Sequence, residues 1–132
     1  MAGYSGTPLA KKLGLRDGMR AHLIRVPSSL APLFAGLDLK KKLAPPLDYI
    51  HVFETDATRL GALFPRLDAA LDDAGMVWIS WPKKASKVPT TVDENVARDL
   101  GLAARLVDVK VCAVDEVWSG LKFMRRLKDR KK

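Results

Sequence analysis

Short apolar runs rich in β-forming residues alternate with helix-type patterns along most of this chain of 132 residues. Three such runs cover residues 19–26, 47–55 and 76–81. Strands that alternate with helices of ordinary length pair as parallel βαβ units with right-handed crossovers. The sequence therefore predicts an α/β domain built on a mainly parallel sheet.

The first helix-type pattern covers residues 28–37, directly after Pro27 closes the first run. Ser28 or Ser29 can cap this helix, because a serine hydroxyl accepts a hydrogen bond from a free amide at a helix start. The apolar positions recur at spacings of three and four residues, as one face of an α-helix requires: Leu30, Leu33, Phe34 and Leu37.

Two further helices are expected later in the chain. Asp56 is a good cap for the second, whose apolar stripe stays in phase across Pro65 and ends at Gly75. We expect a kink or a restart at Pro65, since proline inside a helix removes a hydrogen bond. Residues 91–94 fit a capping box that opens the third helix, which Gly101 closes.

The chain ends in two β-type runs, residues 106–114 and 117–126, joined by Asp115 and Glu116. A connection this short requires an antiparallel hairpin. The predicted fold is thus a small three-layer sandwich with a mostly parallel sheet of about five strands, made of three βα units and a final hairpin. We expect one domain over residues 1–132, with an ordered lead-in at 1–18 and a basic tail at 127–132.

Two resemblances accompany this pattern. Three βα units closed by a hairpin resemble a shortened, Rossmann-like class I methyltransferase fold, from which two βα units would be missing. Three stretches also resemble those of a bacterial domain family of unknown function: GYSGTPL at 3–9, ISWPKK at 79–84 and LVDVKVCAVDEVWSGLKF at 106–123. This second resemblance implies a small cytoplasmic bacterial protein and assigns no catalytic residue.

The formal net charge of +8 raises the alternative of a nucleic-acid-associated protein. Much of the excess is local, in lysines 40–42, in lysines 83, 84 and 87, and in residues 125–132. Charge runs of this kind are usually solvated surface. The start of the chain lacks the apolar stretch of a secretory signal, and no apolar run reaches the roughly 20 residues of a membrane span. We therefore expect a cytoplasmic protein without a membrane partner.

The residue pattern argues against several kinds of chemistry. The single cysteine, Cys112, lies in a β-type run and is expected to be a buried, inert thiol. His22 and His51 also lie inside predicted strands, where a hydrogen-bonded structural role is the expectation and a metal site is not. The first βα turn, residues 25–30, contains no glycine, although close approach of the backbone to a dinucleotide or methyl-donor cofactor needs one. We expect no cofactor in the usual mode.

The best candidate site follows from topology, because ligands collect beyond the carboxyl ends of parallel strands. Hydroxyls, free helix amides and ammonium groups at those ends suit an anionic or phosphate-bearing ligand. The candidate ligand-binding residues are Ser28, Ser29, Trp81, Lys83, Lys84, Ser86 and Lys87. The alternative is an ordinary helix cap beside a solvated loop, with Trp78 and Trp118 in the core.

Glu54 and Asp56 follow the second strand and are candidates for acid–base work, although Asp56 can equally be a simple helix cap. No triad or other catalytic constellation stands out in the sequence. The predicted function is therefore a non-catalytic binding or regulatory module with an anionic ligand. The alternatives that stay open are the nucleic-acid-associated protein and an enzyme with a nonstandard methyltransferase-like site.

Overall fold

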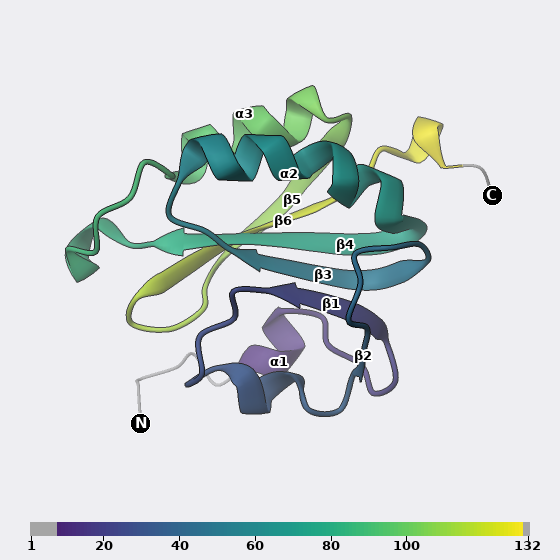
Figure 1. Cartoon of the computed structure of the whole chain (residues 1–132), viewed down its shortest axis with the longest axis horizontal. Helices are drawn as coiled ribbons and strands as arrows, with labels where there is room; N and C mark the ends of the chain where they lie inside the picture. The colour runs from purple at the N-terminus through teal and green to yellow at the C-terminus, as the bar shows by residue number, and fades with distance from the viewer. Residues whose placement is uncertain (1–7, 131–132) are drawn as a thin grey trace.

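The computed structural model describes residues 8–130, which form an α/β fold with a six-stranded sheet (Figure 1). Its helices are α1 (Leu9–Lys12), α2 (Ala57–Ala70) and α3 (Glu94–Ala103), with 3₁₀ turns η1 (Ala31–Phe34), η2 (Lys84–Ser86) and η3 (Leu127–Asp129). Its strands are β1 (Arg20–Ile24), β2 (Asp38–Leu39), β3 (Leu47–Phe53), β4 (Leu71–Pro82), β5 (Leu106–Ala113) and β6 (Trp118–Arg125). Residues 1–7, in the predicted lead-in, and 131–132, in the predicted tail, lie outside the described residues.

The strands run in the order β2-β1-β3-β4-β6-β5. The first four are parallel, and β6 is antiparallel to both β4 and β5. The predicted architecture, a mostly parallel sheet ending in an antiparallel hairpin, is confirmed. The additional strand is β2, whose two residues are too few to give a sequence pattern.

Helices and turns cover both faces of the sheet, so the layers are those expected. In Figure 1, α2 and α3 lie over one face, and α1 with η1 lies over the other. Side chains of β3 alternate between the two cores: Ile50 and Val52 pack toward α2, and Tyr49 and Phe53 pack toward η1. Along the part of the chain that the structure describes, no helix is both long enough and apolar enough to cross a membrane.

The predicted first helix is wrong. Residues 28–30 form a turn and η1 continues it for four residues, so no α-helix follows β1. Neither Ser28 nor Ser29 caps η1, whose N-cap position is Leu30 and has no side-chain hydrogen bond. The i, i+3, i+4 spacing reflects burial of Leu30 and Phe34 in the core on that face, a pattern that a 3₁₀ turn satisfies as well.

The predicted boundaries of α2 also need correction. The helix continues through Pro65 as one element and ends at Ala70, not at Gly75. Leu67 and Phe64 are buried against the sheet, and this packing offsets the hydrogen bond that Pro65 cannot make. Gly75 lies instead within β4, where an added Cβ would stand 2.7 Å from the carbonyl oxygen of Leu47.

The predicted capping box of α3 is wrong in its partners. The cap is Asp93, whose carboxylate accepts a hydrogen bond from the Val96 amide at 2.8 Å. The Thr91 hydroxyl instead accepts from the Ala57 amide at the start of α2, at 2.8 Å. Gly101 lies inside α3 rather than closing it.

The histidines are hydrogen-bonded within the fold, as predicted. His51 is fully buried, and its ring nitrogens lie 2.9 Å from the Tyr49 hydroxyl and 2.7 Å from the Ser80 hydroxyl. Burial lowers the pKa of His51 to about 3, so the ring is neutral. His22 Nδ1 donates to the Lys40 carbonyl at 2.8 Å. Among the residues of known placement, no cluster of three or more His, Cys, Asp and Glu side chains could hold a metal ion.

Cys112 and Trp78 belong to the core beneath α1 and η1. Burial raises the pKa of the Cys112 thiol, which disfavours the reactive thiolate. The Trp78 indole donates its Nε1–H to the Leu13 carbonyl at 3.0 Å and so attaches the segment after α1 to the sheet. Both residues have the buried positions that the sequence predicts.

Candidate functional site

The carboxyl ends of β1 and β3 meet where the chain reverses its direction of progress across the sheet. In open α/β sheets this switch point is the usual ligand crevice. Here, Arg25 and Arg59 approach the buried carboxylate of Glu54, at 3.9 and 3.0 Å. Arg25 has a left-handed backbone with φ of 59°. We call this place the β1–β3 crevice; its ion cluster consists of one buried carboxylate and two guanidinium groups whose side chains are about half exposed.

The carboxylate of Glu54 is held by hydrogen bonds from the following loop and from α2. It accepts hydrogen bonds from the amides of Thr55 and Asp56, at 2.8 and 3.0 Å, and from the guanidinium of Arg59. Burial alone would raise the pKa of Glu54, but these hydrogen bonds and the charge of Arg25 outweigh it and lower the pKa. Asp56 caps α2 by accepting from the Arg59 amide at 2.8 Å. This geometry favours structural roles for both acids over acid–base work.

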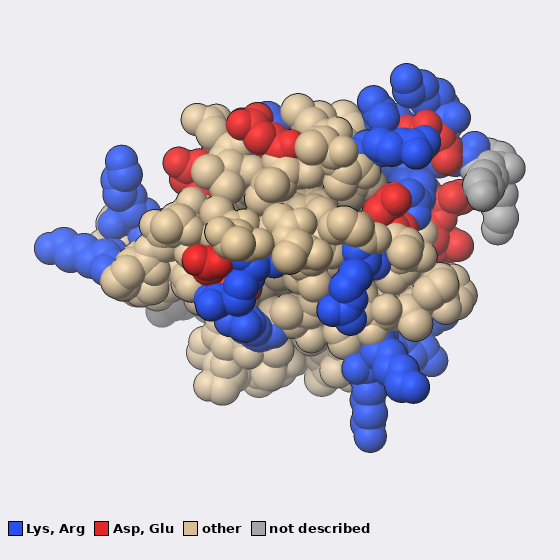
Figure 2. Space-filling model, turned by 45° about the horizontal axis from the view of Figure 1, so that its top comes forward, with Lys and Arg blue, Asp and Glu red and all other residues tan. Residues whose placement is uncertain are grey.

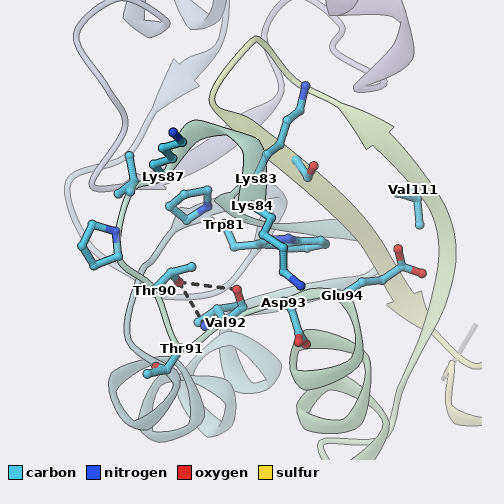
Figure 3. A pocket seen from close by; sticks show the side chains of 14 residues that line it. Trp81, Lys83, Lys84, Lys87, Thr90, Thr91, Val92, Asp93, Glu94 and Val111 are labelled. Carbon is cyan, nitrogen blue, oxygen red and sulfur yellow. Dashed lines mark hydrogen bonds between the residues drawn. The ribbon is translucent and has the colours of Figure 1, made fainter.

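A pocket of about 580 Å³ lies at the carboxyl end of β4, and we call it the β4 pocket (Figure 3). Trp81 and Pro82 from the strand, residues 83, 84 and 87–92 from the following loop, and the start of α3 form most of its lining. The neighbouring hairpin contributes Val111 and Ser119. A volume of this size lies within the range of small-ligand sites, roughly 300–1,000 Å³.

The lining of the β4 pocket carries more positive than negative side chains. Lys83, Lys84 and Lys87 line it, and within residues 8–130 none of these lysines has an ion-pair partner. The two acids of the lining are engaged elsewhere: Asp93 caps α3, and Glu94 is bound by Arg98. The ammonium groups are therefore available to an anion, and the carboxylates are already neutralised or hydrogen-bonded.

The loop that carries these lysines is fixed to the rest of the fold. The Lys83 amide donates to the Val117 carbonyl at 2.6 Å, which ties the loop to the hairpin. At the other end, the Thr90 hydroxyl and the Thr91 amide both donate to the Thr55 carbonyl, at 2.8 and 2.9 Å. Anchored loops lose less conformational entropy on binding, so the pocket is largely preformed.

The structure brings together only part of the predicted site. Trp81, Lys83, Lys84 and Lys87 all line the β4 pocket. Ser86 lies in η2, where its hydroxyl donates to the Lys83 carbonyl at 2.6 Å and supports the loop. Ser28 and Ser29 are exposed residues that follow β1, and β3 lies between β1 and β4. These two serines do not line the pocket, and neither do Glu54 and Asp56.

Sequence reasoning missed the far wall of the pocket. Ser119 reaches it because β6 pairs with β4 so that Ser119 lies opposite Trp81. No local sequence pattern predicts this pairing, since Trp81 and Ser119 are 38 positions apart in the chain. The sequence could have predicted that the start of α3 lines the pocket, because the loop after β4 leads directly to the helix cap at Asp93.

Comparisons by sequence give no relative. No model of a known protein family matches the chain, and no curated protein sequence matches it. The resemblance to the bacterial family of unknown function thus stays a prediction. Two of its stretches contribute to the β4 pocket, through Trp81 to Lys84 and through Val111 and Ser119.

Comparison by structure gives many similar folds. A SAM-dependent methyltransferase from Aquifex aeolicus has a TM-score of 0.68 at 14% identity, over 88% of this chain and 87% of that one. A putative type 11 methyltransferase from Sulfolobus solfataricus has a TM-score of 0.62 at 12% identity, over 94% and 93%. Magnesium protoporphyrin IX methyltransferase from Synechocystis, with bound SAH, has a TM-score of 0.58 at 11% identity, over 89% and 78%. This chain therefore has the Rossmann-like α/β fold of class I SAM-dependent methyltransferases.

Proposed function

We propose that this chain is a non-catalytic binding module whose β4 pocket holds a small, phosphate-bearing anion. The observation that carries the proposal is the gathering of Lys83, Lys84 and Lys87 in one preformed pocket without ion-pair partners among residues 8–130. Ammonium groups form short, strong hydrogen bonds to phosphate oxygens. The free amides at the start of α3 add donors that favour negative charge.

The β1–β3 crevice does not fit the methyl donor that related folds bind. Residues 25–30 offer no glycine, and Arg25 and Arg59 pair there with the buried carboxylate of Glu54. On β2, the acidic side chain of Asp38 is paired with Lys40 at 2.9 Å. Asp38 pairs in register with Arg20 at the amino end of β1, so this carboxylate lies away from the crevice at the carboxyl end of β1, where the usual mode of binding needs an acid to hold the ribose. This disagreement supports binding at β4 rather than catalysis at the crevice.

An enzyme with a nonstandard methyltransferase-like site is the second candidate, because the solved structures of similar fold carry that activity in their names. A nucleic-acid-associated protein is favoured only by the net charge of +8. On the face seen in Figure 2, Lys and Arg side chains form separate groups with uncharged surface between them. In the basic C-terminal segment, Arg125 is bound to Asp68 and Arg126 to Asp129. A cytoplasmic location and a bacterial source stay predictions.

The proposal is tested with a matched pair of double variants, K83A/K84A and K41A/K42A, which remove the same charge from different places. Thermal unfolding and calorimetric titration would be recorded with inorganic phosphate, pyrophosphate, SAM, its demethylated product, and short RNA and DNA. We expect a phosphate-bearing anion to raise the melting temperature of wild type and of K41A/K42A. Its affinity for K83A/K84A should fall at least about tenfold, as expected for losing charged hydrogen bonds.

The other results would redirect the assignment. Stabilisation by SAM that K83A/K84A leaves unchanged would favour the enzyme candidate. Binding of RNA or DNA that disappears at high salt and weakens equally in both double variants would favour nucleic acid. Anion binding of equal strength in K83A/K84A and wild type would remove the β4 pocket from consideration.

A further inference from the structure

The side chain of Trp81 is 6% exposed and belongs to the core between the sheet and α2. It also lines the β4 pocket, where Figure 3 shows its ring among the lysines and the start of α3. An aromatic ring in this position offers a ligand both apolar area and a polar Nε1–H donor.

The donor of Trp81 has no partner within residues 8–130. The Nε1–H of Trp78, by contrast, donates to the Leu13 carbonyl. Every fully buried side-chain nitrogen and oxygen in the described part of the chain is hydrogen-bonded. Trp81 Nε1 therefore keeps some contact with solvent, and the pocket is the cavity that its side chain lines. A nearly buried donor of this kind favours a ligand that brings an acceptor.

A second set of donors lies across the same pocket. The amides of Glu94 and Asn95, at the start of the ten-residue helix α3, make no hydrogen bond with the described residues, since Asp93 caps only Val96. Lys83 and Lys84 add two ammonium groups on the loop side. These donors suit the several oxygens of a phosphate group.

Apolar side chains make up part of the remaining lining, beside polar ones such as Thr90 and Ser119, and the pocket has room for more than a phosphate. Pro82, Val88, Pro89, Val92 and Val111 contribute to a pocket of about 580 Å³. A flat, apolar body with hydrogen-bond acceptors on its edge is what a heteroaromatic ring provides. Such a body can lie along these apolar side chains with its edge toward the indole, because the Nε1–H of Trp81 lies in the plane of the indole ring and meets an acceptor at a ligand's edge.

We infer that the β4 pocket takes a nucleotide-like ligand. A heteroaromatic ring accepts a hydrogen bond from Trp81 Nε1, and a phosphate group is held by Lys83, Lys84 and the α3 amides. This inference rests on the proposed function and deepens it, since it names the class of the anion. It also makes Trp81 the residue that determines specificity for nucleotides over other phosphate compounds.

The test compares the four common nucleoside 5′-monophosphates with ribose 5-phosphate, which lacks only the base. Calorimetric titration of wild type should show at least one monophosphate binding about tenfold tighter than ribose 5-phosphate. W81F keeps a ring and removes the N–H, so it should cut that advantage to about threefold or less while leaving ribose 5-phosphate almost unchanged. W118F is the matched control, because Trp118 packs on the opposite face of the sheet.

A second measurement uses wild type alone. The assigned indole N–H signal of Trp81 should shift in the NMR spectrum with the preferred monophosphate and stay in place with ribose 5-phosphate. Equal affinity of all five compounds, or a full nucleotide preference in W81F, would overturn the inference and leave the anion site intact. Failure of all five to bind wild type would overturn the proposed function together with it.

Discussion

Acidification from pH 7 to pH 5 is expected to destabilise this fold by about 2 kcal/mol through His51 alone. Burial lowers the pKa of His51 to about 3, against 6.5 for an exposed histidine. The unfolded chain therefore binds a proton at this residue between pH 6.5 and pH 3, whereas the folded chain does not. The stabilisation is complete above pH 6.5 and is lost progressively as the pH falls through this window.

The buried surroundings explain why the folded protein keeps the ring neutral. His51 stacks on Phe53 at 4.2 Å between ring centroids, and it lies beside Tyr49 and Ser80 rather than beside a carboxylate. Asp48 and Glu54 also have lowered pKa values, but they lose their contribution only below the ordinary carboxyl range near pH 4. The interval from pH 6.5 to pH 5 thus lies above the range in which these two carboxyls change the stability.

Urea unfolding at pH 7, 6 and 5 measures this effect directly. The free energy of unfolding of H51Q should start lower than that of wild type, since glutamine cannot reproduce the ring that stacks on Phe53, but it should change little over the interval. H22Q is the control, because it removes the other histidine, which lies outside the core; a wild-type slope in this variant assigns the pH dependence to His51. The same slope in H51Q as in wild type would show that other groups cause the pH dependence.

Gly101→Ala is expected to destabilise the protein by about 2 kcal/mol, although alanine is the better helix former by up to about 1 kcal/mol. A Cβ at Gly101 would lie 2.1 Å from Cε2 of Phe123 and 2.6 Å from two further ring atoms. Phe123 is fully buried and packs edge-on against Phe64, at 6.0 Å between centroids. Because the ring is buried and held against Phe64, we expect α3 to shift away from the sheet to admit the added methyl group.

Gly61→Ala is the matched control for this substitution. Gly61 also lies inside a helix, α2, but a Cβ there would meet Leu100 Cδ2 at an ordinary 3.5 Å. This variant should stabilise the protein by about 0.5–1 kcal/mol, because alanine loses less backbone entropy on folding. Urea unfolding of both variants should therefore give changes of opposite sign. A stabilised Gly101→Ala would mean that α3 and β6 are less closely packed than the structure shows.

Many features of the fold could be predicted because they are local. The apolar runs identified β1, β3 and β4, and the short link at Asp115 identified the hairpin, in which the Asp115 carboxylate accepts from the Val117 and Trp118 amides at 2.8 and 2.7 Å. The predicted helix after β1 failed, since core contacts of Leu30 and Phe34 give the same spacing in a 3₁₀ turn as in a helix. The cap of α3 failed similarly, because Thr91 is bound across the fold by Ala57.

The candidate site was likewise predicted only where its residues follow one another in the sequence. Sequence alone identified Trp81, Lys83, Lys84 and Lys87, since aromatic and basic residues at the carboxyl end of a parallel strand suit an anion. It placed Ser28 and Ser29 after the first strand but could not show that β3 separates that strand from β4, because strand order is not encoded in any short pattern.

By itself, therefore, the sequence determined the elements whose hydrophobic period and turn residues are contiguous, together with the basic loop after β4. Only the tertiary structure decided that β3 separates β1 from β4, that Ser119 lies opposite Trp81, and that Arg25 and Arg59 converge on Glu54. Each of these depends on pairing and packing between residues distant in the chain. Such contacts form because the whole core is buried at once, and no single segment specifies them.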